Sequence, residues 1–465
     1  MLFSSPAFFV FFLVYLCFHL TVPARYRVWL IIVGSTVFYA WWRVAYTWLP
    51  YALMATAYFG AMWMERAPDD GSRRQRATIA VVILFVPLFV FKYTDFVYRD
   101  VLGPVFGFRR ALLNLPLPLG VSFITFTLTA YVVDIYKRKF SGHQPASTVM
   151  AYVLFFPHLI AGPILRPYEL IPQLNQPRQA ALRRIAVPLA IFTLGLVKKL
   201  VFADQIADAV DAVYQQSAGN VTAPSALLAI YGFSAQIYCD FSGYTDMALG
   251  LALMLGVRLP TNFLRPYTAD SIVDFWRRWH ITLSYWLRDY LYIPLGGSRH
   301  GRVQETRNVV VTMALGGLWH GANWTFVIWG LFHGVGVAVV HALHRAFKGA
   351  YAIPHWLSVA ITFHFVTVAW VFFRAPDAAR AVQMLRAAAA GGGWADAMAF
   401  AGGNVFILAL LAVFFLLHRY DDHRHVKAAV RWVRPEVFWP AVILLWIVAV
   451  TVSQGSSAKF IYFDF

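Results

Sequence analysis

Residues 324–343 read WTFVIWGLFHGVGVAVVHAL, a run that contains no Asp, Glu, Lys or Arg. A helix needs roughly 20 apolar residues to cross the hydrocarbon core of a bilayer, so this run is long enough to span a membrane. In lipid every backbone polar group must be bonded within the protein, which a helix achieves within one segment. This segment therefore predicts a membrane helix.

Further apolar runs recur along the whole chain. They lie at about 3–22, 28–42, 44–64, 77–91, 117–133, 148–165, 184–203, 222–256, 308–320, 354–373, 404–418 and 437–453. We expect an all-α polytopic membrane protein of roughly 11–13 membrane helices, some of them re-entrant or interfacial because several runs are short for a full crossing. There is no internal repeat and no linker except a Gly-rich patch at 391–393, so we expect one integral membrane domain over residues 1–465.

Composition excludes a soluble enzyme. Charged residues make up 13 % of the chain, whereas a soluble domain has about 25 %. Hydrophobic residues make up 60 %, and a water-soluble body would have to hide nearly all of them. The two cysteines lie in apolar segments and cannot form a disulfide framework.

The net charge of +17 is explained first by topology, because Lys and Arg gather in cytoplasmic loops and meet anionic lipid there. Basic residues follow the first, third and fifth runs, at 25–27, 66–76 and 137–139, which places these loops in the cytoplasm and the N-terminus outside. No basic residue precedes Arg25, so we expect the first run to be a retained span and not a signal peptide. The basic residues form no stripe, which makes nucleic acid a poor candidate partner.

The first polar, aromatic region runs from Asp274 to Tyr290 and reads DFWRRWHITLSYWLRDY. Asp274 can pair with Arg277 or Arg278 on an interfacial helix. One interpretation is an aromatic belt with arginines that reach to the membrane surface. The other is that Arg277 and Arg278 bind phosphates while His280 points into a site, and the two interpretations are compatible.

The second region is GGLWHGANW at 316–324. Burial favours a neutral histidine, so His320 could take the proton of a hydroxyl in O-acyl transfer, which requires no serine or cysteine nucleophile. Asn323, three residues later, would share a helix face with His320 and could orient its ring or donate to the oxyanion. The alternative is that His320, between tryptophans, is a packing residue.

A third group lies in YCDFSGYTD at 238–246. Asp240 and Asp246 could bind a cation, line a cavity or cap a broken helix, and capping is the interpretation we favour. The sequence has no metal-ligand spacing, phosphate loop or hydrolase elbow, so we expect no metal.

The motifs closely resemble the membrane-bound O-acyltransferase (MBOAT) family, and most of all its bacterial branch that O-acetylates alginate. The resemblance rests on DFWRRWHITLSYWLRDYLYIPLGG at 274–297 and GGLWHGANWTFVIWGLFHG at 316–334. Further matches follow in order: GVSFITF at 120–126, FFPH at 155–158, AGPI at 161–164, GLVKK at 195–199, DFSGY at 240–244, WVFFRA at 370–375 and FIYFDF at 460–465. The first hundred residues add little beyond hydrophobicity.

The resemblance implies a multispan body with a pocket or tunnel and two functional histidines. The family's invariant histidine corresponds to His320 and its second histidine to His280, both as catalytic residues. They meet only if the interfacial helix folds back beneath the segment that bears His320. The candidates for substrate binding are Asn323, Trp319, Arg277, Arg278, Asp240 and Tyr244, and a small pocket lined by Trp319, Trp324 and Tyr244 would limit the acyl chain to two carbons.

The resemblance also implies a reaction and a location. Acetyl-CoA or another acetyl donor presents its thioester from the cytoplasm, and no cofactor stays bound. The acetyl group crosses a bacterial inner membrane through a multi-pass protein, and a periplasmic or membrane-anchored acetyltransferase partner places it on an exported polysaccharide such as alginate.

Other functions remain open at the level of the sequence. Within the family they are D-alanyl transfer to teichoic acid and acetylation of peptidoglycan or cellulose. Outside it, a secondary transporter or flippase would use Asp240, Asp246 and His320 as ion-coupling groups at the bilayer midplane. A structural scaffold for a secretion complex would not need His320 for its function.

Overall fold

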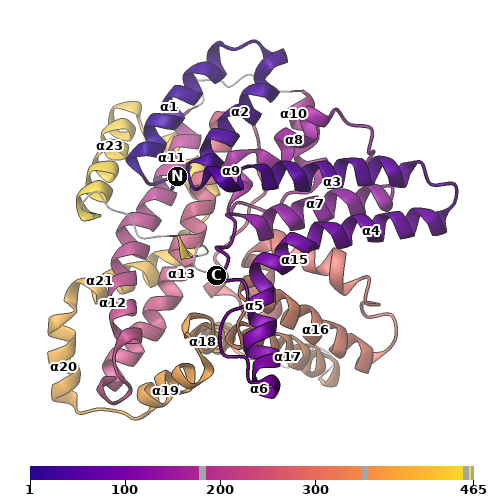
Figure 1. Cartoon of the computed structure of the whole chain (residues 1–465). Coiled ribbons are helices and arrows are strands. Elements are labelled where there is room, and N and C mark those ends of the chain that lie inside the picture. The colour runs from indigo at the N-terminus through magenta and orange to yellow at the C-terminus, as the bar shows by residue number, and fades with distance from the viewer. Residues whose placement is uncertain (177–184, 348–352, 454–459, 462–465) are drawn as a thin grey trace. The chain divides into compact units, whose positions relative to one another are not determined.

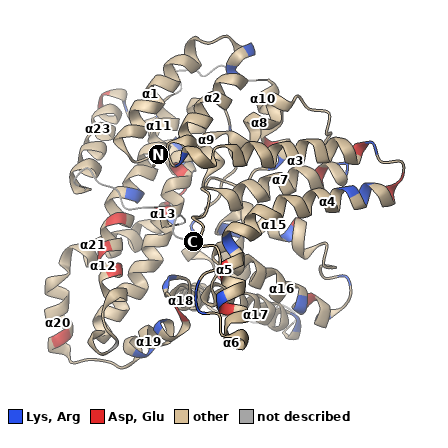
Figure 2. Cartoon of the chain, in the orientation of Figure 1, with Lys and Arg blue, Asp and Glu red and all other residues tan. Residues whose placement is uncertain are grey.

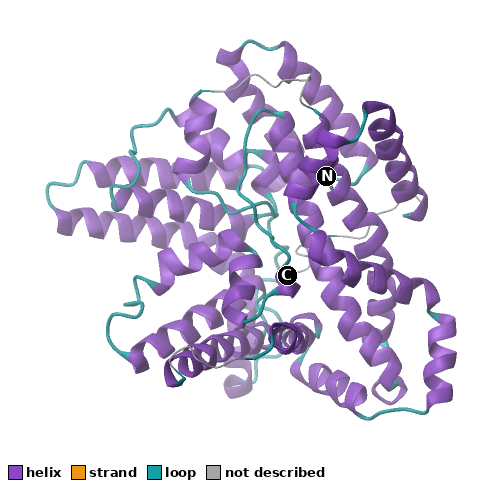
Figure 3. Ribbon diagram, turned by 180° about the vertical axis from the view of Figure 1, so that it is seen from behind, coloured by secondary structure: helices purple, strands orange, loops and turns teal. Residues whose placement is uncertain are grey.

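The computed structural model describes residues 1–176, 185–347, 353–453 and 460–461. Throughout these residues the regular elements are helices, and none is a strand (Figure 3). The predicted all-α fold is therefore confirmed. Residues 462–465 of the terminal motif lie outside the described residues.

The chain divides into two compact units, the first comprising Met1–Phe192 and Thr245–Pro260 and the second Thr193–Tyr244 and Thr261–Phe465. Two of the three boundaries fall inside continuous helices, α11 (Ala186–Val197) and α13 (Ala223–Met254), and the third, between Pro260 and Thr261, falls in the loop that follows α13. A single domain over residues 1–465 stays a prediction. All the candidate site residues belong to the second unit.

In the first unit, α3, α4 and α7 pack side by side (Figure 1). The sequence sets the starts of its helices: Pro6 begins α1 after Ser5, and the Asp69 carboxylate accepts the Ser72 N–H at 2.8 Å before α4. Its α-helices, apart from the parts of α11 and α13 that it contains, are α1 (Pro6–Thr21), α2 (Arg27–Ala40), α3 (Trp48–Glu65), α4 (Asp70–Leu88), α5 (Thr94–Phe96), α6 (Gly103–Phe106), α7 (Val121–Tyr136), α8 (Ala146–Leu154), α9 (Phe156–Leu159) and α10 (Pro167–Asn175).

In the second unit, α14 packs against α17 and α18, and α16 packs along α17. Besides the end of α11 and the first part of α13, its elements are η6 (Lys198–Ala203), α12 (Asp204–Gln215), η8 (Pro266–Thr268), α14 (Ile272–Arg278), α15 (Ile281–Leu287), η9 (Arg288–Tyr292), α16 (Arg302–His320), α17 (Trp324–Ala346), α18 (His355–Arg374), α19 (Ala378–Ala389), α20 (Trp394–Gly403), α21 (Val405–Leu417), η10 (His418–Tyr420), α22 (His423–Trp432) and α23 (Pro435–Val452).

The hairpin of α16 and α17 depends on glycines where the two helices touch. A Cβ added to Gly317 would collide with the Phe326 carbonyl oxygen, and one added to Gly330 would collide with the Met313 carbonyl oxygen. Only residues without a side chain allow backbones to approach so closely. The glycines of the second motif therefore bring α16 and α17 together, with His320 at the last residue of α16.

Five helical segments within the described residues are long and apolar enough to cross a membrane: Asp70–Phe106, Ala186–Gln215, Trp324–Ala346, His355–Arg374 and Pro435–Val452. Trp394–Gly403 and Val405–Tyr420, bent by 88° at their junction, make a sixth if counted as one span. Pro6–Thr21 and Val121–Tyr136 are shorter apolar helices.

This count is smaller than the expected 11–13 because several apolar runs form short or divided helices. The run at 28–42 forms α2, which has 14 residues and is about 21 Å long, against a hydrocarbon core of about 30 Å. The run at 148–165 is divided between α8 and α9. Hydrophobicity shows that such segments avoid water, but it does not show whether each one crosses the bilayer.

The surface of the helices is that of a membrane protein. Charged residues occupy few positions on the helices (Figure 2). In α23, Ile443, Leu444 and Ile447 are each more than half exposed. Contiguous apolar surface of this kind is stable in lipid and not in water. The multi-pass membrane location is thereby supported by both charge and exposure.

Candidate active site

His320 lies in an enclosure of aromatic rings at the end of α16. Its side chain is buried, and its ring centroid lies 5.0 Å from that of Trp319, 5.1 Å from Trp329 and 5.4 Å from Phe373. The ring of Trp329 is nearly perpendicular to the imidazole, at 88°. This enclosure excludes bulk water, so a proton transferred to the imidazole stays within the site.

His280 lies at a break between two short helices. The interfacial helix expected from Asp274 to Tyr290 ends at Arg278, and α15 starts at Ile281. His280 has φ 41°, in the left-handed region that non-glycine residues rarely adopt. The expectation of one continuous helix is wrong here, because a left-handed residue cannot continue a right-handed helix.

The ring of His280 is completely buried and in contact with α13. The centroid of Phe241 lies 4.8 Å from that of His280, with the two rings perpendicular. His280 Nδ1 lies 3.2 Å from Asn262 Oδ1. Burial lowers the pKa of His280 to about 3, so that its ring is neutral at physiological pH.

The two candidate catalytic histidines share one neighbour. The ring centroid of Trp319 lies 6.3 Å from that of His280 and 5.0 Å from that of His320. The chain turns back after α14 and brings the two motifs together around Trp319. This is the fold-back that a meeting of the two histidines was expected to need. Trp319 itself is buried, and its ring contacts both histidines.

Asn323 does not share a helix face with His320, contrary to expectation. Helix α16 ends at His320, and Asn323 is the N-terminal cap of α17, where its Oδ1 accepts the Thr325 N–H at 3.0 Å. Its Nδ2 donates to the Pro376 carbonyl oxygen at 3.0 Å. The backbone of Gly321 is extended between the two helices, so His320 and Asn323 do not lie three residues apart on one helix. A role of Asn323 in substrate binding stays a prediction.

The two adjacent arginines of α14 have different surroundings. Arg278 Nη2 lies 2.8 Å from Asp274 Oδ2, which is the expected i+4 pair, and Arg278 Nη1 donates to Thr268 Oγ1 at 2.9 Å. The bond to Thr268 ties α14 to η8. Arg277 is exposed and lines a cavity, so of the two it is the one placed to meet a ligand.

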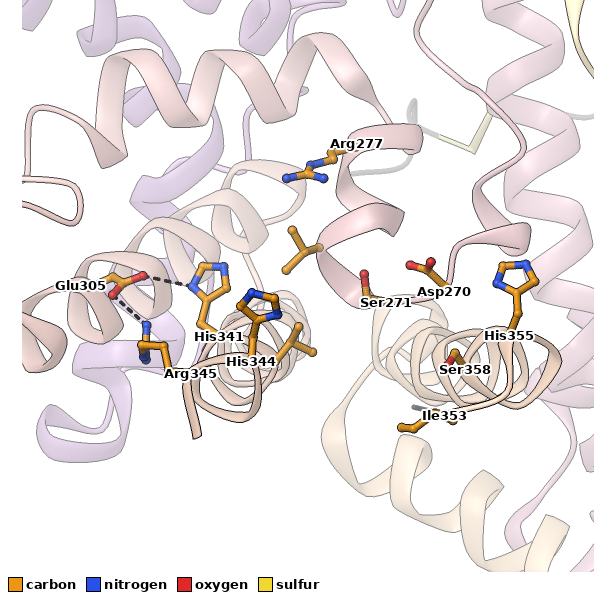
Figure 4. Close-up of a pocket in the computed structure, with 12 residues that line it drawn as sticks. Asp270, Ser271, Arg277, Glu305, His341, His344, Arg345, Ile353, His355 and Ser358 are labelled. Atoms are coloured by element: carbon orange, nitrogen blue, oxygen red, sulfur yellow. Dashed lines mark hydrogen bonds and ion pairs between the residues drawn. The ribbon is translucent and has the colours of Figure 1, made fainter. Parts of the chain in front are cut away.

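This cavity has a volume of about 590 Å³ and a polar lining (Figure 4). His341, His344 and Arg345 of α17 lie on one side of it, and His355 and Ser358 of α18 lie on the other. Glu305 of α16 accepts from Arg345 at 3.0 Å and lies 3.2 Å from His341 Nδ1. The remaining residues in the lining are Asp270, Ser271, Val273, Arg277, Val340 and Ile353.

An apolar groove of about 220 Å³ shares Val273 and His341 with this cavity. Trp276, which lines the groove, has its ring centroid 5.8 Å from that of Trp329. Trp329 in turn contacts His320. A polar cavity, an apolar groove and the enclosure of His320 thus follow one another along α17.

Asp240 and Tyr244 lie on α13, which runs unbroken from Ala223 to Met254. The favoured interpretation that Asp240 or Asp246 caps a helix is wrong, because a residue inside a helix has no unbonded N–H groups to cap. Asp240 Oδ1 instead lies 2.8 Å from Lys199 Nζ, and its Oδ2 accepts the Ile461 N–H at 2.7 Å. These two contacts give Asp240 a structural role.

Tyr244 is buried against the C-terminal segment, with its ring centroid 4.7 Å from that of Phe460. Trp324, in contrast, is 49 % exposed at the start of α17. Trp324 therefore does not form a buried side of the expected small pocket lined by Trp319, Trp324 and Tyr244. Contact of Tyr244, Asp240 or Trp319 with substrate stays a prediction.

Sequence reasoning missed Asn262, Trp329 and Phe373, which contact the two histidines. Asn262 stands in an unremarkable polar stretch, and its distance of 18 residues from His280 carries no periodic signal. Trp329 could have been found, because it lies in the same motif as His320. In the described part of the chain, no three His, Cys, Asp or Glu side chains gather closely enough to hold a metal ion.

Comparison with known proteins identifies relatives over most of the chain. The profile of MBOAT, the membrane-bound O-acyltransferase family, matches residues 87–412. A protein of Azotobacter vinelandii named "Probable alginate O-acetylase AlgI" is 41 % identical over 85 % of this chain and 79 % of its own length. Its namesake in Pseudomonas aeruginosa is 39 % identical over 92 % of this chain and 84 % of its own length. The peptidoglycan O-acetyltransferase of Helicobacter pylori is 38 % identical over 78 % of this chain and 74 % of its own length.

Proposed function

Because this chain belongs to the membrane-bound O-acyltransferase family and is an O-acyltransferase, we propose that it moves acetyl groups across the bacterial inner membrane for O-acetylation of an exported polysaccharide, with alginate as the preferred candidate. The observation that carries the proposal is the buried histidine His320 in its aromatic enclosure, inside the region that the family profile matches. The names of the Azotobacter and Pseudomonas relatives favour alginate.

The proposed chemistry is general-base catalysis of acyl transfer. An imidazole nitrogen of His320 takes the proton of the acceptor hydroxyl while the hydroxyl oxygen forms a bond to the thioester carbonyl carbon. The carbon–sulfur bond of the resulting tetrahedral adduct then breaks, and the imidazolium returns the proton to the leaving thiolate. The products are an acetate ester and a free thiol.

We propose acetyl-CoA as the donor, with its charged end in the cavity beside Arg277. Guanidinium groups bind phosphate by charge-assisted hydrogen bonds, and Arg277 is not held in an ion pair with Asp274 as Arg278 is. The apolar groove would take the linear arm of the donor, because it adjoins the cavity and extends to Trp276. The apolar lining of this groove suits an uncharged chain and not a phosphate.

We further propose that a periplasmic or membrane-anchored acetyltransferase receives the acetyl group and places it on the polymer. This division follows from chemistry, because the donor thioester is a cytoplasmic metabolite and the polymer is outside the cell. Acetylation of peptidoglycan is the second candidate, which the name of the Helicobacter relative favours.

The proposal is tested by replacing His320 with Ala in the producing cell and measuring ester-linked acetate on the exported polysaccharide. His300→Ala is the matched control, because His300 belongs to the same unit and is exposed. We expect acetate to vanish in His320→Ala and to persist in His300→Ala, at equal membrane levels of both variants. Acetate at the wild-type level in His320→Ala contradicts the proposal. If the polymer lacks acetate in the wild type but peptidoglycan carries it, the second candidate replaces the first.

A further inference from the structure

Asn262 is buried beside His280, where its side-chain oxygen accepts from two residues. Its Oδ1 lies 3.1 Å from the Thr282 backbone N, 2.9 Å from Thr282 Oγ1 and 3.2 Å from His280 Nδ1. Its backbone carbonyl oxygen accepts the Ile281 N–H at 3.0 Å. One asparagine thus bonds to three successive residues, His280, Ile281 and Thr282.

These bonds fix which atom of the Asn262 amide faces His280. The Thr282 backbone N–H can only donate, so the amide atom that it meets must be the oxygen and not the nitrogen. The same oxygen meets His280 Nδ1. An amide oxygen can only accept, so Nδ1 must carry a proton to bond with it.

The proton on Nδ1 determines the chemistry of the other ring nitrogen. A neutral imidazole carries one proton, so Nε2 holds a lone pair and acts as an acceptor. In O-acyl transfer, the group that needs an acceptor is the hydroxyl, whereas the oxyanion of the tetrahedral adduct needs a donor. The neutral ring of His280 can therefore accept from a second hydroxyl of the acceptor, beside the one whose proton His320 takes, and it cannot donate to the oxyanion through Nε2.

The same contacts hold the unusual backbone of His280. Its φ of 41° is costly for a non-glycine residue and persists only where neighbouring bonds stabilise it. Asn262 accepts from the N–H groups of Ile281 and Thr282, two of the groups in the first turn of α15, which has no capping side chain from His280 itself. Asn262 therefore positions both the backbone and the ring.

We propose that Asn262 is a positioning residue that holds the proton of His280 on Nδ1, so that His280 accepts through Nε2 from a hydroxyl of the acceptor other than the one whose proton His320 takes. This role deepens the proposed acyl transfer and rests on it. The hydrogen bonds of the Asn262 side chain within the described residues all use its oxygen. The Nδ2 group is buried and makes no hydrogen bond within the described residues.

The first test measures the tautomer without activity. The full-length protein is prepared in lipid nanodiscs with ¹⁵N-labelled histidine rings, and the His280 resonances are identified as those lost in His280→Gln. We expect the protonated nitrogen to be Nδ1 in the wild type and in Asn262→Asp, which retains an accepting oxygen. We expect Asn262→Ala to lose this preference. A wild-type protein with the proton on Nε2 overturns the proposal, whether or not acetyl transfer is observed.

The second test measures kinetics in membranes supplied with acetyl-CoA, as ester-linked acetate formed on the exported polymer. Asn262→Ala should lower kcat about 10- to 100-fold, a part of the roughly 10²–10⁴-fold effect of general acid–base groups, with the KM for acetyl-CoA within about twofold of wild type. Asn262→Asp should retain most of kcat. Thr282→Val is the control, because it removes only the hydroxyl that donates to Asn262 and leaves the backbone N–H.

Two results separate positioning from a merely structural role. If Asn262→Asp loses as much activity as Asn262→Ala at equal thermal stability, Asn262 does not act through its accepting oxygen and the proposal is overturned. The same holds if Thr282→Val reduces kcat as strongly as Asn262→Ala. If the wild type transfers no acetyl group while the tautomer is as expected, the proposed function fails and the assignment of the His280 proton stands.

Discussion

Lys199 Nζ lies 2.8 Å from Asp240 Oδ1 and 2.7 Å from Asp204 Oδ1, and the side chains of Lys199 and Asp240 are each only 4 % exposed. Asp240 also accepts the Ile461 N–H. A carboxylate that looked from the sequence like a cap or a cation ligand is therefore part of a buried charge cluster that holds the C-terminal segment. The close approach of Gly243 to the Gly195 carbonyl oxygen, 2.8 Å from an added Cβ, lets α13 and α11 come together near this cluster.

Replacing Asp240 with Ala should therefore destabilise the protein strongly. The change removes one of the two carboxylates beside Lys199, which keeps Asp204, and it takes the acceptor from the Ile461 N–H, a loss that typically costs about 1–3 kcal/mol for a buried group. The measurement is thermal unfolding in detergent, with Asp208→Ala as a control because Asp208 is exposed on α12. An unchanged melting temperature in Asp240→Ala would show that the cluster does not hold the fold.

Gly330→Ala should move α16 away from α17 and reduce acetyl transfer. The added Cβ meets the Met313 backbone, and overpacking of this kind costs about 1–3 kcal/mol. Gly402→Ala is the matched control, because an added Cβ there meets nothing within 4 Å and helix propensity improves. Both effects are measured as ester-linked acetate and as thermal stability; equal behaviour of the two variants would contradict the close contact.

Arg277→Ala should raise the KM for acetyl-CoA about tenfold with little change in kcat, because it removes a charge that acts in binding and not in the chemical step. Arg299→Ala, an exposed arginine outside the cavity lining, should change neither constant. Arg278→Ala should instead lower the melting temperature, since Arg278 is bonded to Asp274 and Thr268. If Arg277→Ala has the same KM for acetyl-CoA as the wild type, the cavity does not bind the donor.

Phe460→Ala should weaken the protein and lower acetyl transfer together. Phe460 is completely buried, and its ring lies 4.7 Å from Tyr244 and 5.9 Å from Phe241, which contacts His280. A buried Phe→Ala change costs about 3–5 kcal/mol. Trp432→Ala, at a side chain that is 83 % exposed, serves as the control. Activity and melting temperature that stay at wild-type values in Phe460→Ala would show that this segment does not support the site.

The sequence alone was sufficient for the membrane environment, the helical class and the family, because hydrophobic length, low charge and ordered motifs are properties of consecutive residues. It also identified His320 and His280 as candidate catalytic residues, through the motifs that contain them. Helical spacing offered Arg277 and Arg278 as partners of Asp274, and the structure pairs Asp274 with Arg278.

Tertiary structure alone decided what those residues touch. The left-handed backbone of His280 breaks the helix that its neighbours favour, and the bonds that stabilise this break come from Asn262. Asn323 became a cap because Gly321 interrupts the helix of His320. Asp240 became an ion-pair partner because Lys199 and Ile461 approach it across 41 and 221 positions of sequence. Contacts of this kind carry no periodic signal, since they depend on how helices pack and not on the spacing within any one of them.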